Sequence, residues 1–125
     1  MSISEYDADV PRLATTADVF NAIAEPQRRR LLDLLAGGPR AVADLAAALH
    51  QPQPLVSKHL RVLRTVDLVR SRQDGRQRIY ALHPQGLRHV LAWVQGFERF
   101  WASDPARLDE YLAELQHREV GGDLV

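Results

Sequence analysis

Apolar residues recur at helical spacing through the first fifty positions of the chain. Val19, Phe20 and Ile23 mark one side of a first helix, and leucines form a broad face on a second. Pro26 suits the first turn of that second helix, where its missing N–H is not needed. The pattern predicts helices that begin at Thr16 or Ala17, that run from Pro26 to Gly37-Gly38-Pro39, and that cover Val42 to Leu49.

The stretch from residue 51 to 64 predicts a fourth helix with two contrasting faces. On a helical wheel, Val56, Leu60 and Leu63 fall on one side. The other side carries polar and basic residues, namely Ser57, Lys58, Arg61, Arg64 and Thr65. With the third helix and the tight turn at residues 50–53, this stretch predicts a helix-turn-helix whose second helix enters a DNA groove. Taken alone, it is equally typical of an amphipathic helix with a solvated basic face.

Residues 68–82 change to a strand-like pattern with Asp74-Gly75 at its centre, which is a strong hairpin signal. The hairpin carries four arginines, Arg70, Arg72, Arg76 and Arg78. The alternative is a surface hairpin charged for solubility, but mixed signs are the usual choice for that purpose. A basic hairpin directly after a helix-turn-helix predicts a two-stranded wing.

The C-terminal third predicts two further helices with more apolar surface than a monomer needs. A long helix after Pro84 carries Leu87, Val90, Leu91, Val94, Phe97 and Trp101 on one face. Another begins at Asp104-Pro105 and carries one stripe, Leu108, Tyr111, Leu112 and Leu115. These faces predict a partner surface, most simply a second copy of the chain. The alternative is that the helices fold back and complete the core of the monomer.

Length and charge refine this prediction. The chain of 125 residues suits one domain, which we expect to cover residues 16–117, between a flexible segment 1–15 and a flexible tail 118–125. The net charge is zero, yet residues 50–90 hold eight Lys/Arg against two Asp/Glu, while both ends are acidic. A localised basic region is typical of a DNA-binding protein. With no cysteine, no membrane-length apolar run and no secretory signal, we expect a cytoplasmic protein.

Four stretches together resemble the ArsR family of winged-helix repressors, in the right order over about residues 17–103. They run from Phe20 to Leu32, from Val42 to Ala46, from Gln53 to Leu63 and from Asp74 to Leu82. The resemblance implies a mainly α fold with a small β-hairpin wing, and a homodimer built on the first and last long helices. It also implies that the protein binds operator DNA and is released by an effector.

The resemblance does not extend to the metal sites of the family. The arsenic-sensing branch carries two cysteines where this chain has Ala41 and Ala43. The zinc and nickel ligands of another branch align with residues that cannot bind a metal, namely Pro84, Gly86, Phe97 and Phe100. None of the five histidines pairs at i+3 or i+4 with a second ligand. We therefore predict no metal and no cofactor. Two departures affect the turn, where His50 replaces the usual glycine and Pro52 the usual serine cap.

The leading hypothesis is a sequence-specific DNA-binding regulator, a homodimeric repressor that reads an inverted repeat in double-stranded DNA. The expected DNA-binding residues of the recognition helix are Gln53, Ser57, Lys58, His59, Arg61 and Arg64, and those of the wing are Arg70, Arg72, Arg76 and Arg78. The expected dimer residues are Phe20, Leu91, Val94, Phe97 and Trp101. The expected effector is an unidentified small molecule or protein. One possibility is a small apolar or aromatic molecule that binds between the last helices.

Other interpretations remain open for particular features. The alternative function is a winged-helix protein-interaction module that docks through its aromatic C-terminal helix. His59 either packs at the apolar margin of its helix or bonds a base or phosphate. The run Arg28-Arg29-Arg30 is a solvated face or a phosphate contact. No phosphate-binding glycine loop or nucleophile motif is present, and we expect no enzymatic activity.

Overall fold

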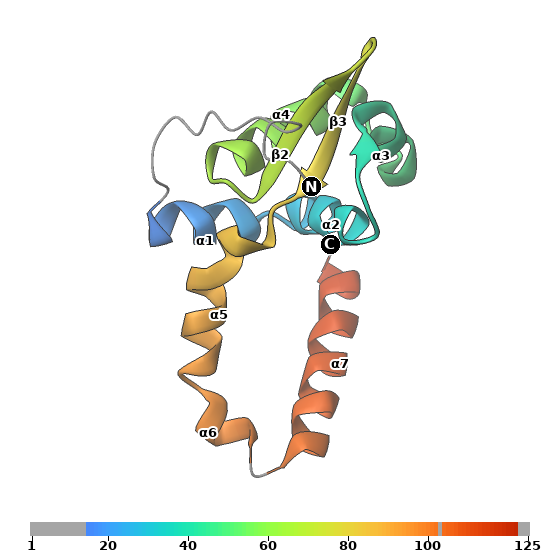
Figure 1. The fold of residues 1–125 in the computed structure, drawn as a ribbon. Coiled ribbons are helices and arrows are strands. Elements are labelled where there is room, and N and C mark those ends of the chain that lie inside the picture. Colours follow the sequence, from blue (N-terminus) through green and yellow to red (C-terminus); the bar gives the residue numbers. More distant parts are fainter. Residues whose placement is uncertain (1–14, 103, 123–125) are drawn as a thin grey trace. The chain divides into compact units, whose positions relative to one another are not determined.

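A computed structural model of the chain describes residues 15–102 and 104–122 and, among their side chains, those up to residue 118 (Figure 1). The chain forms two compact units, one ending at Val90 and one beginning at Leu91. This differs from the single domain predicted over residues 16–117. The described residues that form the buried apolar core all precede Val90, whereas most large apolar side chains from Leu91 onward are exposed. The predicted flexible segment lies outside the described residues except for Thr15.

The first unit begins with three helices, the first two of which have side-chain N-caps. Helix α1 covers Thr16–Ala24, and Thr15 forms a capping box with Asp18. Helix α2 covers Pro26–Ala36, and the Glu25 carboxylate accepts a hydrogen bond from the Gln27 N–H at 2.9 Å. Helix α3 covers Val42–Leu49, as the apolar spacing predicted.

Two arginines of α2 bind the C-terminal carbonyl groups of α1. The Nε of Arg28 donates to the Ala22 oxygen at 2.6 Å, and Nη1 of Arg29 donates to the Ile23 oxygen at 2.6 Å. A helix C-terminus has unsatisfied carbonyls and partial negative charge, so a guanidinium stabilises it. Arg28 and Arg29 are therefore half-buried residues that join α2 to the end of α1, a structural role that the sequence did not predict.

The sheet of the first unit has three antiparallel strands in the order β1-β3-β2, which cover Arg40–Ala41, Gln77–Leu82 and Val69–Asp74. The predicted hairpin is β2 and β3, and Figure 1 shows its turn projecting from the first unit. The predicted two-stranded wing is confirmed, and an unpredicted third strand, β1, pairs with β3 through Arg40–Tyr80 and Ala41–Ile79. A strand of two residues is too short to show an alternating pattern.

The core of the first unit lies between the helices and the inner face of the sheet. Helix α4 covers Gln53–Thr65 and contributes Val56, Leu60 and Leu63, each with no exposed surface. Leu87 and Val90, which follow the wing, pack against the same core and are partly buried. The core thus fixes which side of α4 faces solvent.

The predicted long helix after Pro84 is interrupted. A 3-10 turn covers Pro84–Leu87, α5 covers Arg88–Gln95 and α6 covers Glu98–Trp101. At the break, the Phe97 N–H bonds the Val94 oxygen, three residues back, at 3.0 Å. Gly96 explains the break, since glycine costs about 1 kcal/mol relative to alanine inside a helix.

Helix α7 covers Pro105–Gly122. The Asp104 side chain caps it by accepting from the Arg107 N–H at 3.2 Å, as predicted from the sequence. The helix extends past residue 118, where the tail was predicted to start, and the Glu114–Arg118 ion pair at 2.9 Å supports that turn. Residues 123–125 of the predicted tail lie outside the described residues. Over the described residues, no helix combines the length and apolar character required to cross a membrane.

Candidate nucleic-acid interface

Helices α3 and α4 are joined by a tight turn whose backbone is left-handed at His50. His50 has φ 55° and ψ 42°. The Gln51 N–H bonds the Ala46 oxygen at 3.1 Å and the His50 N–H bonds the Ala47 oxygen at 3.2 Å. These two bonds form a Schellman motif, which ordinarily has glycine at the position of His50. His50 therefore adopts a left-handed backbone conformation that is uncommon for a residue with a side chain.

Replacing His50 by glycine is expected to stabilise the first unit by about 0.5–1 kcal/mol, because a side chain in the left-handed region costs about that much. His50 is exposed, and the hydrogen bonds and ion pairs described for this part of the chain do not involve its side chain. Urea denaturation measures the change. His50→Ala is the control, since alanine keeps the side-chain penalty, and equal stability of the two variants would contradict the prediction.

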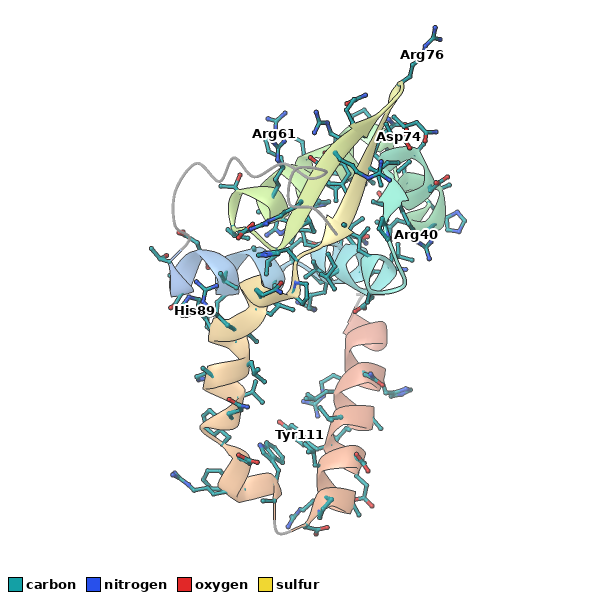
Figure 2. The ribbon with its side chains drawn as sticks, viewed as in Figure 1. Arg40, Arg61, Asp74, Arg76, His89 and Tyr111 are labelled. Carbon is teal, nitrogen blue, oxygen red and sulfur yellow. The ribbon has the colours of Figure 1, made fainter. Side chains whose placement is uncertain are left out.

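Helix α4 presents the polar face expected from its sequence. Lys58 and Arg61 are exposed and Ser57, His59 and Arg64 are half-buried. Figure 2 shows Arg61 pointing away from the body of the unit. The N-cap is Pro52, which forms no side-chain capping bond, and Gln53 is exposed in the first turn. The exposed face is therefore basic, while the opposite face is held in the core.

The four wing arginines differ in their surroundings. Nη1 of Arg78 donates to the hydroxyl of buried Ser71 at 2.8 Å, and Arg72 lies 3.6 Å from the Asp74 carboxylate. Arg70 is bound to Asp67, with Nε 3.1 Å from Oδ1. Arg76 is exposed at the hairpin tip and extends away from the unit (Figure 2). The sequence did not distinguish these four residues.

Asp67 connects the end of α4 to the base of the wing. It is left-handed, with φ 61°, and the Leu68 N–H bonds the Leu63 oxygen at 2.9 Å, so α4 also ends in a Schellman motif. Nδ1 of His83 lies 3.0 Å from the Asp67 carbonyl oxygen and 3.4 Å from its carboxylate. Together with the Arg70 contact, these interactions fix where the wing leaves α4. The sequence analysis missed this junction, although aspartate after a helix end is one of the residues that tolerates a left-handed backbone.

The predicted dimer residues are found in both units. Phe20 is half-buried on α1, in the first unit. In the second unit Leu91, Val94 and Phe97 are exposed and Trp101 is half-buried. Val94, Phe97 and Trp101 line one apolar groove between α5/α6 and α7. The groove also takes in the apolar stripe of α7, which the sequence predicted as part of a partner surface without naming its residues among the dimer contacts.

The positions that align with known metal ligands are Ala41, Ala43, Pro84, Gly86, Phe97 and Phe100, none of which carries a metal-binding group. In the part of the chain that the structure describes, no three histidine or carboxylate side chains come together as a possible metal site.

A helix-turn-helix followed by a β-hairpin wing, all built on one core, defines the first unit as a winged helix-turn-helix domain. Residues 25–71 match the family described as bacterial regulatory protein, arsR family.

Individual relatives agree with this family. The HTH-type transcriptional regulator Rv2034 of Mycobacterium tuberculosis is 43% identical over 82 residues, or 66% of this chain and 74% of that protein. The transcriptional repressor SdpR of Bacillus subtilis is 32% identical over 80 residues, or 64% and 89%. The solved structure of the homodimeric winged helix-turn-helix DNA-binding domain of Mb0332 from Mycobacterium bovis, a possible ArsR-family transcriptional regulator, is 32% identical, with TM-score 0.55 over 66% of this chain and 77% of that one. The chain belongs to the ArsR family of transcriptional regulators, which confirms the resemblance and the expectation of a regulator rather than an enzyme.

Proposed function

We propose that the protein is a cytoplasmic homodimeric repressor that binds an inverted-repeat operator and is released by an effector other than a metal ion. The observation that carries the proposal is the basic, solvent-facing side of α4, whose opposite side is fixed by Val56, Leu60 and Leu63 in the core. The relative SdpR is named a transcriptional repressor, which supports repression rather than activation.

Base contacts are assigned to the exposed face of α4 and phosphate contacts to its end and the wing. The first group is Gln53, Ser57, Lys58, His59 and Arg61, and the second is Arg64, Arg70, Arg72, Arg76 and Arg78. The ion pair of Arg70 with Asp67 does not exclude a phosphate contact, because a guanidinium has five donors. The half-buried position of His59 leaves its ring accessible to a base or a phosphate.

The dimer is assigned to Phe20 of α1 and to Leu91, Val94, Phe97 and Trp101 of α5 and α6. Three observations and a symmetry argument support it. The α5 side chains are exposed, and apolar surface of this extent is typical of an interface. Thr16 and His89, at the starts of α1 and α5, lie 3.3 Å apart, so these two helix ends adjoin. The Mb0332 domain is a homodimer. A two-fold dimer presents two recognition helices about 34 Å apart, which matches an inverted repeat.

Selection of bound duplexes from random DNA tests the proposal. The expected result is a palindrome with half-sites about 10 base pairs apart. Affinity for the selected site should fall at least about tenfold for each doubling to quadrupling of the salt concentration, because several phosphate contacts release counterions. A module that docks a protein through apolar surface would enrich no sequence and respond little to salt, and that outcome would overturn the proposal.

Release by an effector other than a metal is supported by the alanines at positions 41 and 43 and by the absence of ligand side chains at the other aligned positions. Loss of operator binding on addition of zinc, nickel or arsenite would contradict this part of the proposal.

Within the interface, Arg61→Ala and Arg76→Ala are expected to weaken binding in different ways. Arg61→Ala should cost about 1–3 kcal/mol on the selected operator and relax the sequence preference, because Arg61 is assigned to a base. Arg76→Ala should weaken binding to all sequences alike and reduce the salt slope by about one. Fluorescence anisotropy on operator and random duplexes at several salt concentrations measures both effects.

The control is Arg107→Ala on α7, which removes the same charge from an exposed residue with no assigned DNA contact. It should leave affinity and salt slope unchanged. Identical behaviour of the Arg61 and Arg76 variants would show that the division between base and phosphate contacts is wrong.

A further inference from the structure

The second unit contains an apolar groove that its own side chains leave open. Helices α5 and α6 line one side of it and α7 the other, and it encloses about 540 Å³. Trp93, Val94 and Phe97 come from the first side, and Tyr111, Leu112 and Leu115 from the second. The rings of Trp101 and Tyr111, 5.4 Å apart, join α6 to α7, and Figure 2 shows Tyr111 on the side of α7 that faces α5 and α6.

Several large apolar side chains of the groove are about half exposed. Trp93 is 59% exposed, Leu112 48% and Tyr111 46%. They lie together on facing helices and so form one continuous patch. Contiguous apolar surface of this kind marks an interaction site.

The extent of the exposed surface indicates the type of occupant. Leu91 is 57% exposed and Phe100 58%, yet neither lines the groove. A small molecule that filled the groove would leave both of them in water. A second copy of the chain would bring the same apolar faces and cover the groove and its surroundings together, as a two-fold interface requires.

The groove is also continuous with the dimer surface assigned above. Val94, Phe97 and Trp101 belong to both, so a protomer that covers them meets α7 as well. We propose that α7 is part of the dimer interface and that Tyr111, Leu112 and Leu115 contact the partner subunit. This inference rests on the homodimer of the proposed function and extends it to a helix that lies beyond the residues matched to the family.

Two glutamate substitutions on α7 form a matched pair of variants. Leu112→Glu places a carboxylate in the groove, whereas Ala113→Glu places one on the far side of the same helix, where Ala113 is exposed. Sedimentation equilibrium should show that Leu112→Glu raises the dimer dissociation constant at least about tenfold, and that Ala113→Glu leaves it unchanged. Equal constants for the wild type and Leu112→Glu would overturn the inference.

A measurement on the wild-type protein covers the case in which Leu112→Glu fails to fold, which circular dichroism detects. Hydrogen–deuterium exchange is followed at protein concentrations above and below the dimer dissociation constant. Amides of residues 105–118 should exchange more slowly in the dimer. Protection confined to α1 and α5 would overturn the inference.

Binding of an apolar dye separates the remaining outcomes. The wild-type dimer should not bind anilinonaphthalene sulfonate, because the partner covers the groove. Dye binding by the wild-type dimer, abolished by Leu112→Glu, would overturn the inference in favour of a small-molecule site. A protein that dimerises through α7 but selects no DNA sequence would overturn the proposed function and leave this inference intact, whereas a dimer that selects a palindrome but shows no protection of α7 would do the reverse.

Discussion

Gly86→Ala is expected to lower the free energy of unfolding of the first unit by about 2 kcal/mol, which corresponds to a fall in Tm of about 10 °C. Gly86 is buried in the 3-10 turn that follows the wing. An added Cβ would overlap the Asp67 carbonyl oxygen and lie 2.9 Å from Leu68 Cδ2. Asp67 cannot move away easily, because its left-handed backbone ends α4 and its carboxylate binds Arg70.

Two effects of opposite sign act at this position. Alanine restricts the unfolded chain and would stabilise by about 0.4–1 kcal/mol if it fitted. Overlap with a backbone atom in a packed core costs about 1–3 kcal/mol, so the strain outweighs the gain. Differential scanning calorimetry at one fixed protein concentration measures the difference, since the proposed dimerisation would make Tm depend on concentration.

Gly37→Ala is the matched control. Gly37 has φ −81°, and a Cβ there would meet the Leu34 oxygen at an ordinary 3.4 Å. This variant should be neutral or slightly more stable than the wild type. If Gly86→Ala were as stable as Gly37→Ala, the result would contradict the close packing of the 3-10 turn against Asp67.

The parts of the fold that local chemistry determines were predictable from the sequence. Helix α3 has the predicted limits, because its apolar period is short and complete. The hairpin turns at Gly75 and Arg76, one residue later than the predicted centre, and Gly75 has the positive φ, 61°, that glycine favours. The Glu25 and Asp104 caps are local features as well, since each residue stands directly before a proline that begins a helix.

Features that depend on distant partners were not predictable in the same way. Strand β1 exists because Arg40 and Ala41 pair with β3, about forty residues later. The contacts of Arg28 and Arg29 with α1 depend on how α1 and α2 pack, and a run of three arginines does not indicate that packing. Asp67 acquires its role only when α4, the wing and the 3-10 turn meet.

In the candidate interface, too, some features were predictable from the sequence and others depend on the fold. The polar face of α4 was predictable, because helical period determines which residues lie opposite a buried stripe. The four wing arginines looked equivalent in the sequence, and only the folded hairpin separates Arg76 at the tip from Arg70 at the base. The groove in the second unit was not predicted as such, since Gly96 divides the expected long helix and α7 supplies the opposite wall.

Leu60→Ala is expected to cost about 3 kcal/mol of unfolding free energy in the first unit. Leu60 has no exposed surface and lies in the core cluster with Leu31 and Leu45. The loss combines the transfer of the removed methyl and methylene groups with the cavity they leave, and buried leucines typically lose about 2–5 kcal/mol. Urea denaturation followed by far-ultraviolet circular dichroism measures it.

The comparison with Leu55→Ala makes this a test of the DNA-binding surface as well as of stability. Leu55 is on the same helix and 39% exposed, so its truncation should cost less than about 1 kcal/mol. The two leucines mark different sides of α4, and the side that is buried determines which side meets DNA. Equal losses would mean that α4 is rotated from the orientation described, and Ser57, Lys58 and Arg61 would then lose their assignment to the bases. If Leu60→Ala loses much stability and Leu55→Ala does not, the buried face of α4 is supported. If the Leu60→Ala variant also keeps its operator affinity below its Tm, the assigned DNA contacts are supported.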